Sequence, residues 1–524
     1  MSEENVRLSF SFSPLPGAVA LTRGNQVLAC GLEETVTNRP GDDNLPLGAL
    51  EASLLRSGLA AEAISSVCCV GDPRLDFERL LARALLCFPH LNAAVMDRAA
   101  HQIERGYLTP KTLLRQKLAP KAATFDVQDP IEAWAAAAVG LLDAGEQEEA
   151  IIAVLSPLPG QQGLVTLRHR QGHWVDRKMR PGWARTIPAL LQAAYRALEI
   201  ERGDRLKALS ALAESCPEEI DIDLAPLLGP PGSGLLARRR QYLALMPAHL
   251  AKGLIDLFGL PKTSLGGERA RAAKGILSWI DRTMTAEIAS LAKQTGCNRI
   301  VLAGLAGQLP PLALPDLDIR RDQRPLGLTA VLGGAANGED VNRPCGPEDD
   351  GMEAIKASGL GLDQTFQTPK NAAGQVSRHL GSGGKVALYW GPWALGGTDF
   401  GAGVILETGQ QDSLLLPDRQ ASKLQNWLDR PTALGPFSSG HARLADGRVP
   451  RVLIPAEAED PPFALQVLHH LLEGESASPL SAKPLAMPSE PPVCSANAAL
   501  RALAYSDIDL LLLDDKLISK RIAL

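Results

Sequence analysis

Residues 7–34, "RLSFSFSPLPGAVALTRGNQVLACGLEE", decide the fold because they predict how the chain begins. Apolar and polar residues alternate on both sides of Arg23-Gly24-Asn25, and this triplet has the turn chemistry of a β-hairpin. Residues 44–59 then carry apolar side chains at helical spacing, and "ISSVCCVG" at 64–71 is typical of a buried strand. The chain therefore begins with a predicted β-β-α-β order.

Helix and hairpin recur further along the chain. The predicted elements are a helix at 130–145, strands at 149–156 and 163–169 joined through Pro159-Gly160, a helix at 186–198, a helical stretch from Leu206 to about Ser290, and a strand with terminal glycines at 298–307. Hairpin-bearing strands repeated around a helical insert predict an α/β fold of the duplicated actin and sugar-kinase type.

A domain boundary is predicted near residue 350. The segment 337–354, "NGEDVNRPCGPEDDGMEA", is rich in Gly, Pro, Asn and acidic residues, which is typical of an exposed linker. A chain of 524 residues also exceeds the size at which a single core usually stops growing. We expect a first domain over 1–350 and a separate mixed α/β domain over 351–524, with limited proteolysis cutting first between residues 338 and 355.

Composition and charge exclude several classes of protein. Hydrophobic residues make up 45% and charged residues 21%, the net charge is -6, and only Arg238-Arg239-Arg240 forms a basic run, so we expect neither a nucleic acid nor a membrane as partner. The eight cysteines are scattered without paired spacing and indicate reduced core residues. The N-terminal residues lack the pattern of a signal peptide, so a cytoplasmic protein is expected.

The C-terminal residues 489–520, "SEPPVCSANAALRALAYSDIDLLLLDDKLISK", resemble the ending of the O-carbamoyltransferases of antibiotic and nodulation-factor synthesis. Further stretches resemble this family in matching order, so that the likeness covers nearly the whole chain. They are residues 19–59, 202–215, 326–338 and 383–406.

The resemblance implies both a fold and a reaction. It implies a duplicated actin-like (ASKHA-type) domain over 1–350, followed by a YrdC-like mixed α/β domain over 351–524. Members of the family make a carbamoyl-adenylate from carbamoyl phosphate and ATP, and pass the carbamoyl group to a hydroxyl with the help of a divalent metal. ATP and carbamoyl phosphate are thus the ligands that the resemblance implies.

The family's metal ligands are replaced in this sequence. Pro130, Ile131 and Trp134 stand where three histidines belong, and none of the three can ligate a metal. Asp129 and Glu132 are nearby acids, and Glu132 is better explained as a partner of the helix dipole. Other catalytic or ligating positions fall on Leu15, Pro16, Leu155 and Gly327, and His90 and His101 are interpreted as ordinary surface or core residues. We therefore predict no bound metal and assign no catalytic residue.

The family's phosphate-binding cations are replaced in part. Its arginines and glutamate fall on Pro392, Ala394 and Thr398, or on Trp393 in an alternative register. The cations that do match, and that we predict to bind a cofactor, are Lys207, Lys385, Arg430 and Arg448, with Arg451 as the alternative to Arg448.

Two classes of function follow. The chain is either a carbamoyltransferase-family enzyme with impaired or absent activity, or a non-catalytic paralogue that partners an active enzyme or binds a nucleotide. A changed chemistry that uses Lys207, Lys385 and Arg430 is a third interpretation. An active carbamoyltransferase paralogue or a second copy of the chain is the expected partner.

Overall fold

The computed structural model contains two compact units. One unit comprises residues 1–68 and 323–524, and the other comprises residues 69–322. The described residues are 6–72 without 14 and 25, scattered positions between 74 and 104, 124–142, 149–157, 163–200 without 171–172 and 181, 205–228, 247–260, 266–335, 355, 358, 360–391, 402–456 without 410–412, 425, 435 and 445, and 461–520 without 474–479 and 488–489. The predicted linker at 337–354 lies outside them.

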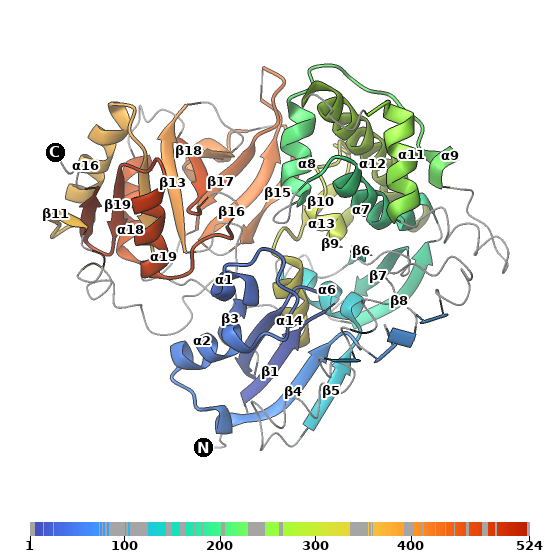
Figure 1. Ribbon diagram of the computed structural model, residues 1–524, viewed down its shortest axis with the longest axis horizontal. Coiled ribbons are helices and arrows are strands. Elements are labelled where there is room, and N and C mark those ends of the chain that lie inside the picture. Colours follow the sequence, from blue (N-terminus) through green and yellow to red (C-terminus); the bar gives the residue numbers. More distant parts are fainter. Residues whose placement is uncertain are drawn as a thin grey trace. The chain divides into compact units, whose positions relative to one another are not determined.

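The N-terminal sheet is built around the predicted hairpin (Figure 1). Its strands are β1 (Val6–Ser11), β2 (Ala18–Arg23), β3 (Gln26–Leu32), β4 (Ile64–Val70) and β5 (Thr124–Gln128), in the order β3-β2-β1-β4-β5. β1 and β2 are antiparallel, as are β2 and β3. Gly24 in the turn has a φ of 59°, a left-handed conformation that glycine adopts without strain. The predicted hairpin is confirmed.

Helices from both segments of this unit, 1–68 and 323–524, cover the sheet. α1 (Glu33–Thr37) follows β3, α2 (Leu47–Ser57) packs on β2 and β3, and α14 (Leu326–Ala335) packs on β1, β2 and β3. The Glu33 carboxylate accepts hydrogen bonds from the N–H groups of Gly48 (3.2 Å) and Ala49 (2.8 Å) in the first turn of α2. It therefore caps a helix whose own N-cap residue, Pro46, offers no side-chain acceptor.

A second five-stranded sheet repeats the strand order of the first. Its strands are β6 (Ala150–Leu155), β7 (Leu164–Arg170), β8 (His173–Arg180), β9 (Arg299–Gly304) and β10 (Asp318–Arg321), in the order β10-β9-β6-β7-β8. β6, β7 and β8 form an antiparallel meander, and β9 and β10 continue the sheet in parallel to β6. If the strands of each sheet are numbered one to five along the chain, the first sheet has the order 3-2-1-4-5. The second sheet has the same order when it is followed from β8 to β10. The duplicated actin-like fold predicted from the sequence is confirmed by this repeat.

The long segment between β8 and β9 is helical where it is described. It contains α7 (Ile187–Ala197), α8 (Arg205–Glu214), α9 (Ala225–Leu228), α11 (Pro247–Phe258) and the 30-residue α12 (Gly266–Thr295). α7 packs on α11, and α8 packs on α12. α6 (Pro130–Val139) packs on β6 and β9, and the short α13 (Leu305–Gln308) follows β9.

Two buried arginines, Arg320 and Arg321, lie on β10, an edge strand of this second sheet. Arg320 is 6% exposed and donates from Nη1 to the carbonyl of Leu141, just beyond the end of α6 (2.6 Å). Arg321 is 4% exposed and donates to the carbonyls of Gly307 (3.0 Å) and Leu309 at the end of α13. Because the last carbonyls of a helix have no intrahelical partner and carry negative partial charge, these guanidinium groups have a structural explanation.

The C-terminal residues form a ten-stranded mixed sheet. Its strands, in chain order, are β11 (Gly361–Thr365), β12 (Val386–Tyr389), β13 (Gly403–Thr408), β14 (Ser413–Leu415), β15 (Trp427–Leu434), β16 (Phe437–Ala442), β17 (Arg451–Pro455), β18 (Leu480–Pro484), β19 (Leu510–Leu513) and β20 (Lys516–Ser519). In space they follow the order β11-β20-β19-β12-β13-β18-β14-β17-β16-β15. The mixed α/β architecture predicted for this part of the chain is confirmed.

Helices cover both faces of the centre of this sheet. α16 (Pro369–Gly381) and α18 (Phe463–Leu472) share one core with Val386, Leu388 and Trp390, and α19 (Ala496–Tyr505) shares another with Ala387 and Tyr389. A short helix, α17 (Asp418–Ala421), packs on β17. Alternate residues of β12 thus enter opposite cores, as the two-residue period of a strand requires. No helix among the described residues is long and apolar enough to cross a membrane.

Candidate functional site

The predicted positions of the metal ligands lie at the start of α6. Pro130 is the first residue of the helix, and the side chain of its N-cap, Asp129, accepts a hydrogen bond from the N–H of Ile131 (2.8 Å). Ile131 is 3% exposed and Trp134 is fully buried, on a helix that packs against β6 and β9. Two of the three positions where the resemblance implies imidazoles, Ile131 and Trp134, therefore belong to the hydrophobic core of this chain.

The two acidic residues beside these positions share one arginine. Arg177 on β8 contacts Glu132 Oε1 with Nη1 (2.6 Å) and Asp129 Oδ2 with Nη2 (3.1 Å). Since one guanidinium already binds both carboxylates, a divalent cation would have to displace Arg177 to be held by them. Within the described ranges no three His, Cys, Asp or Glu side chains are grouped so that they could hold a metal ion. The residues present do not fit the metal that the family resemblance implies.

Lys385, one of the predicted phosphate-binding cations, takes part in an ion-pair network. Its ammonium group contacts the carboxylate of Asp507, which raises the pKa of the lysine, and lies 3.7 Å from Glu407 Oε2. Its backbone N–H donates to Asp509 Oδ2 (2.7 Å). Glu407 is 6% exposed, and its Oε1 lies 2.7 Å from the Nζ of Lys483. The ammonium groups of two lysines thus face the carboxylates of Asp507 and Glu407, so the charge of each lysine is already paired.

Within the same compact unit, the predicted cation Arg430 does not join Lys385. Arg430 is an exposed residue of β15, at the edge of the ten-stranded sheet, six strands away from the β12 strand next to Lys385. At about 4.8 Å per strand this is roughly 29 Å along the sheet. Arg448 is exposed and pairs with Asp446 (2.6 Å), and Lys207 is an exposed residue of α8 in the other compact unit. Pro392, Trp393, Ala394 and Thr398 lie outside the described residues.

The sequence did not reveal a buried polar pair next to Arg430. Asp429 is 3% exposed, and its carboxylate lies 3.1 Å and 3.2 Å from the Nδ1 of His441 and also accepts from the backbone N–H of His441. On the neighbouring strand the Nε of Arg451 donates to the Ser439 hydroxyl (2.6 Å). These four side chains come from β15, β16 and β17 and fix the register of the sheet's edge. The only sequence signal was an acid and a histidine twelve residues apart.

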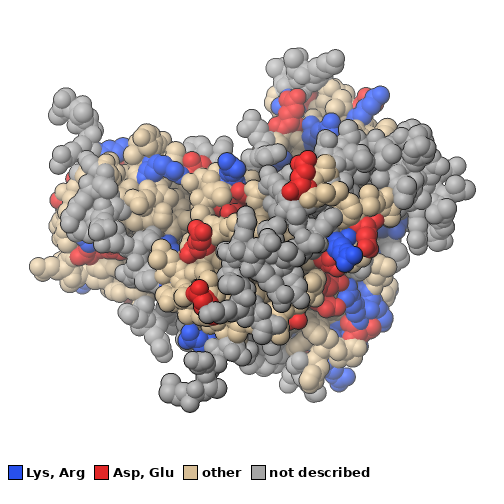
Figure 2. All heavy atoms as spheres, turned by 60° about the horizontal axis from the view of Figure 1, so that its bottom comes forward, with Lys and Arg blue, Asp and Glu red and all other residues tan. Residues whose placement is uncertain are grey.

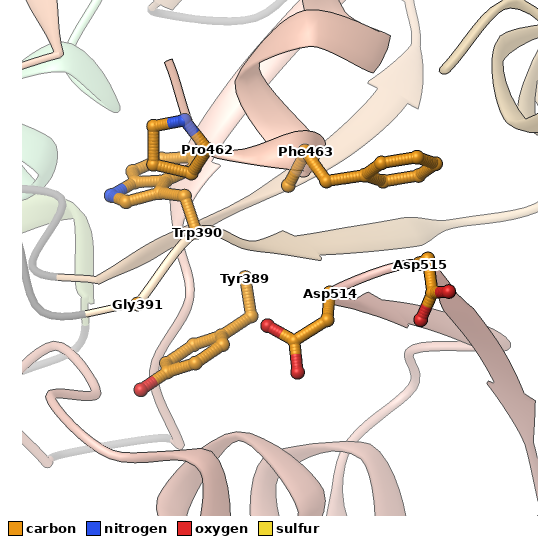
Figure 3. A pocket seen from close by; sticks show the side chains of 8 residues that line it. Tyr389, Trp390, Gly391, Pro462, Phe463, Asp514 and Asp515 are labelled. Atoms are coloured by element: carbon orange, nitrogen blue, oxygen red, sulfur yellow. The ribbon is translucent and has the colours of Figure 1, made fainter. Parts of the chain in front are cut away.

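A cavity of about 210 Å³ lies at the carboxyl end of β12 (Figure 3). It is lined by Tyr389, Trp390 and Gly391 from the end of β12, by Pro462, Phe463 and Ala464 at the start of α18, and by Asp514 and Asp515 in the turn between β19 and β20. In Figure 3 the carboxylate of Asp514 points toward Tyr389, while Pro462 and Phe463 lie on the opposite side of the strand. The sequence had singled out none of these residues.

Basic and acidic side chains are interspersed among the described residues of one face of the molecule (Figure 2). Figure 2 shows this for the described residues of one face, where Lys and Arg side chains lie beside Asp and Glu. Such a face produces no large field of one sign that would attract a polyanion.

Strand order and strand direction define the class of this chain: a protein with a duplicated actin-like fold, extended by a ten-stranded α/β sheet. Comparison with family models and with curated proteins finds no match. Among solved structures, component A of (R)-2-hydroxyglutaryl-CoA dehydratase from Acidaminococcus fermentans aligns with a TM-score of 0.33 and 12% identity, over 63% of this chain and 95% of its own. The ROK hexokinase from Thermus thermophilus aligns with a TM-score of 0.27 and 16% identity, over 63% and 97%. TM-scores this low carry no argument about the fold. The fold is therefore assigned from the strand order alone.

Proposed function

We propose that this chain is a carbamoyltransferase-type protein in which carbamoyl transfer is impaired or absent, and that it works as a non-catalytic partner of an active enzyme. The observation that carries the proposal is the start of α6. Fully buried Trp134 and nearly buried Ile131 occupy two of the expected ligand positions, and Arg177 pairs with both neighbouring acids. A metal there would need both a rebuilt core and a broken ion-pair network.

Charge supports the same proposal. ATP and carbamoyl phosphate bring several negative charges to one place, which convergent cations would have to balance. Lys385 and Arg448 are each paired with carboxylates, and Arg430 lies at the edge of the sheet. Charge-assisted contacts contribute roughly 1.5–3 kcal/mol each. The loss of two would therefore weaken binding of these substrates by about two to four orders of magnitude.

Gly304 at the end of β9 and Gly307 in α13 bear on the alternative, a nucleotide-binding protein. A side chain at Gly304, whose φ is 61°, would meet the carbonyl of Leu155 at 2.6 Å, and one at Gly307 would overlap the carbonyl of Asp322. Close packing of the turn against the neighbouring strands thus accounts for both glycines without a phosphate. This packing favours the role of a partner over that of a nucleotide sensor.

The test is exchange of labelled pyrophosphate into ATP, with carbamoyl phosphate present and absent. We expect no exchange that depends on carbamoyl phosphate, because the part of the chain that the structure describes offers neither the metal ligands nor a convergent set of cations. An intact O-carbamoyltransferase serves as the positive control under the same conditions. Exchange by this chain at a rate near that of the control would overturn the proposal and make Lys207, Lys385 and Arg430 the first residues to replace.

A further inference from the structure

β8 (His173–Arg180) is an edge strand of the second five-stranded sheet and pairs with β7 on one side (Figure 1). Among the described strands none follows it on the other side. All its residues from His173 to Met179 are exposed, so both faces of the strand reach the solvent. An edge strand of this kind presents unpaired backbone N–H and C=O groups, to which a further strand can be added.

A hollow of about 640 Å³ lies beside this edge. Its lining consists of four consecutive residues of β8, a glycine just beyond the strand and three residues from one side of α12: Arg177, Lys178, Met179, Arg180, Gly182, Glu287, Ser290 and Gln294. Because successive side chains of a strand point to opposite faces, four consecutive lining residues place the hollow along the edge of β8 rather than on one face. It leaves room for a partner strand.

The charges of β8 complement themselves in one antiparallel register. Opposite residues of an antiparallel pair point to the same face, so a twofold pair of identical strands is centred on one residue position. The register centred on Arg177 places Asp176 of each copy opposite Lys178 of the other. Within one strand Asp176 Oδ2 lies 2.7 Å from Lys178 Nζ, so the two side chains share a face. The pair of strands would therefore carry four alternating charges on that face.

The same register matches the exposed apolar residues of β8. Val175 and Met179 are 57% and 59% exposed, and each lies opposite the other residue of the second copy. Trp174, 44% exposed, extends the apolar surface at both ends of the pair. Registers centred on Asp176 or Lys178 would instead oppose two like charges and would separate Val175 from Met179. The register centred on Arg177 is thus favoured by charge and by apolar contact together.

The centre of this register brings two arginines together. Each Arg177 already contacts the carboxylates of Glu132 and Asp129, so four carboxylates offset the two positive charges. A lysine and a bulge at an edge are also devices that prevent strand pairing, and β8 has both, with its bulge at Val175. Here, however, the lysine has an acid opposite it in the second copy, which favours pairing.

We propose that two copies of this chain associate through the free edges of β8, in the antiparallel register centred on Arg177. The two five-stranded sheets then form one continuous sheet across the twofold axis. The contact is isologous and uses the β8 edge of both copies, so it closes at a dimer. An interface built around one strand is small, and we expect a dissociation constant of about 1–100 μM. The inference does not depend on the proposed role as a partner of an active enzyme.

The first test is sedimentation velocity of the full-length protein over a range of about 5–200 μM. We expect a shift from monomer to dimer within this range. Hydrogen exchange at both ends of the range locates the interface, because amides that become hydrogen-bonded between the copies exchange more slowly. The slowing with concentration should fall on residues 174–180.

Charge-swapped variants test the register. Asp176→Lys places lysines opposite lysines, and Lys178→Asp places acids opposite acids, so each variant alone should dimerise at least tenfold more weakly. In an equimolar mixture the two variants offer lysines on one strand and acids on the other, and they should form a mixed dimer about as tight as that of the unmodified protein. Lys252→Glu, at an exposed position of α11 in the same compact unit, is the control for net charge and should change nothing.

The mixture separates pairing between copies from effects on folding. Both variants lose the contact between residues 176 and 178 within their own strand, so only a contact between copies can restore association when they are mixed. Three results would overturn the inference. The unmodified protein remains monomeric at 200 μM, in which case the lysine and the bulge protect the edge. A dimer forms but residues 174–180 exchange as in the monomer. The single variants dimerise like Lys252→Glu, or their mixture associates no better than either alone.

Discussion

Replacing Trp134 by histidine, the residue type that the family resemblance places there, should unfold the chain more readily without creating a metal site. Trp134 is fully buried between α6 and the strands β6 and β9. The smaller ring leaves a void on the order of 70 Å³, which costs about 2 kcal/mol at roughly 24 cal/mol per Å³. A buried imidazole without a partner adds about 1–3 kcal/mol. We expect a total loss of about 3–5 kcal/mol in the free energy of unfolding.

Urea denaturation and calorimetry measure this loss. For a compact unit of this size each kcal/mol shifts the melting temperature by roughly 2–4 °C, so Trp134→His should melt about 6–20 °C below the unmodified protein. Ala136→His places the same residue type on the same helix at a half-buried position, and should cost much less. Repeating the scans with Zn²⁺ or Mn²⁺ shows whether a metal restores the lost stability.

Two results together would contradict this expectation. In the first, Trp134→His is as stable as the Ala136→His control. In the second, one equivalent of a divalent metal raises the melting temperature of Trp134→His. That outcome would mean that α6 faces a site able to bind a metal, and that the carboxylates of Asp129 and Glu132 leave Arg177 to join it.

Three further predictions concern the unmodified protein and two other variants. Arg320→Met should cost about 1–3 kcal/mol in urea denaturation, because it leaves the buried carbonyl of Leu141 without its donor. Burial raises the pKa of Glu33 above its ordinary value of 4.5, against the opposing hydrogen bonds from Gly48 and Ala49. The folded protein thus binds this proton more tightly than the unfolded chain, and stability falls as the pH rises from about 4.5 through the raised pKa. Glu33→Gln should flatten this part of the stability–pH curve, whereas an unchanged slope would contradict the assignment. Elemental analysis of the purified protein should find no stoichiometric iron, zinc or manganese, and one metal ion per chain would contradict the interpretation of α6.

Elements with a strong apolar period could be predicted from the sequence. The hairpin around Gly24, the helix α6 and the fully buried strands β6 and β9 all lie where alternation, helical spacing or an apolar run indicated them. The edge strand β8 could not be found in this way. Almost all its residues are exposed, so its sequence "HWVDRKMR" has no period of two between a core and the solvent.

The candidate site was less predictable, because its contacts join residues far apart in the sequence. Lys385 matches a family lysine, but its carboxylate partner Asp507 comes more than a hundred residues later. Asp429 and His441 pair across a hairpin with two register shifts, and although Pro431 lies in the second shift, a single proline does not determine which acid meets which histidine. The cavity combines the ends of two parallel strands with a helix start, so it exists only once the order of the ten strands is known.

The order of the elements along the chain delays the completion of the N-terminal sheet during synthesis, because its covering helix α14 is made late. α14, which covers β1, β2 and β3, follows β4 by about 260 residues, and the intervening chain builds the other compact unit. At about 5–20 residues per second, a ribosome needs roughly 13–50 s to make this stretch. For that time the face of β1, β2 and β3 that α14 will cover lacks this helix. A nascent chain stalled before residue 326 should therefore expose this face to chaperones, and one released after residue 335 should not.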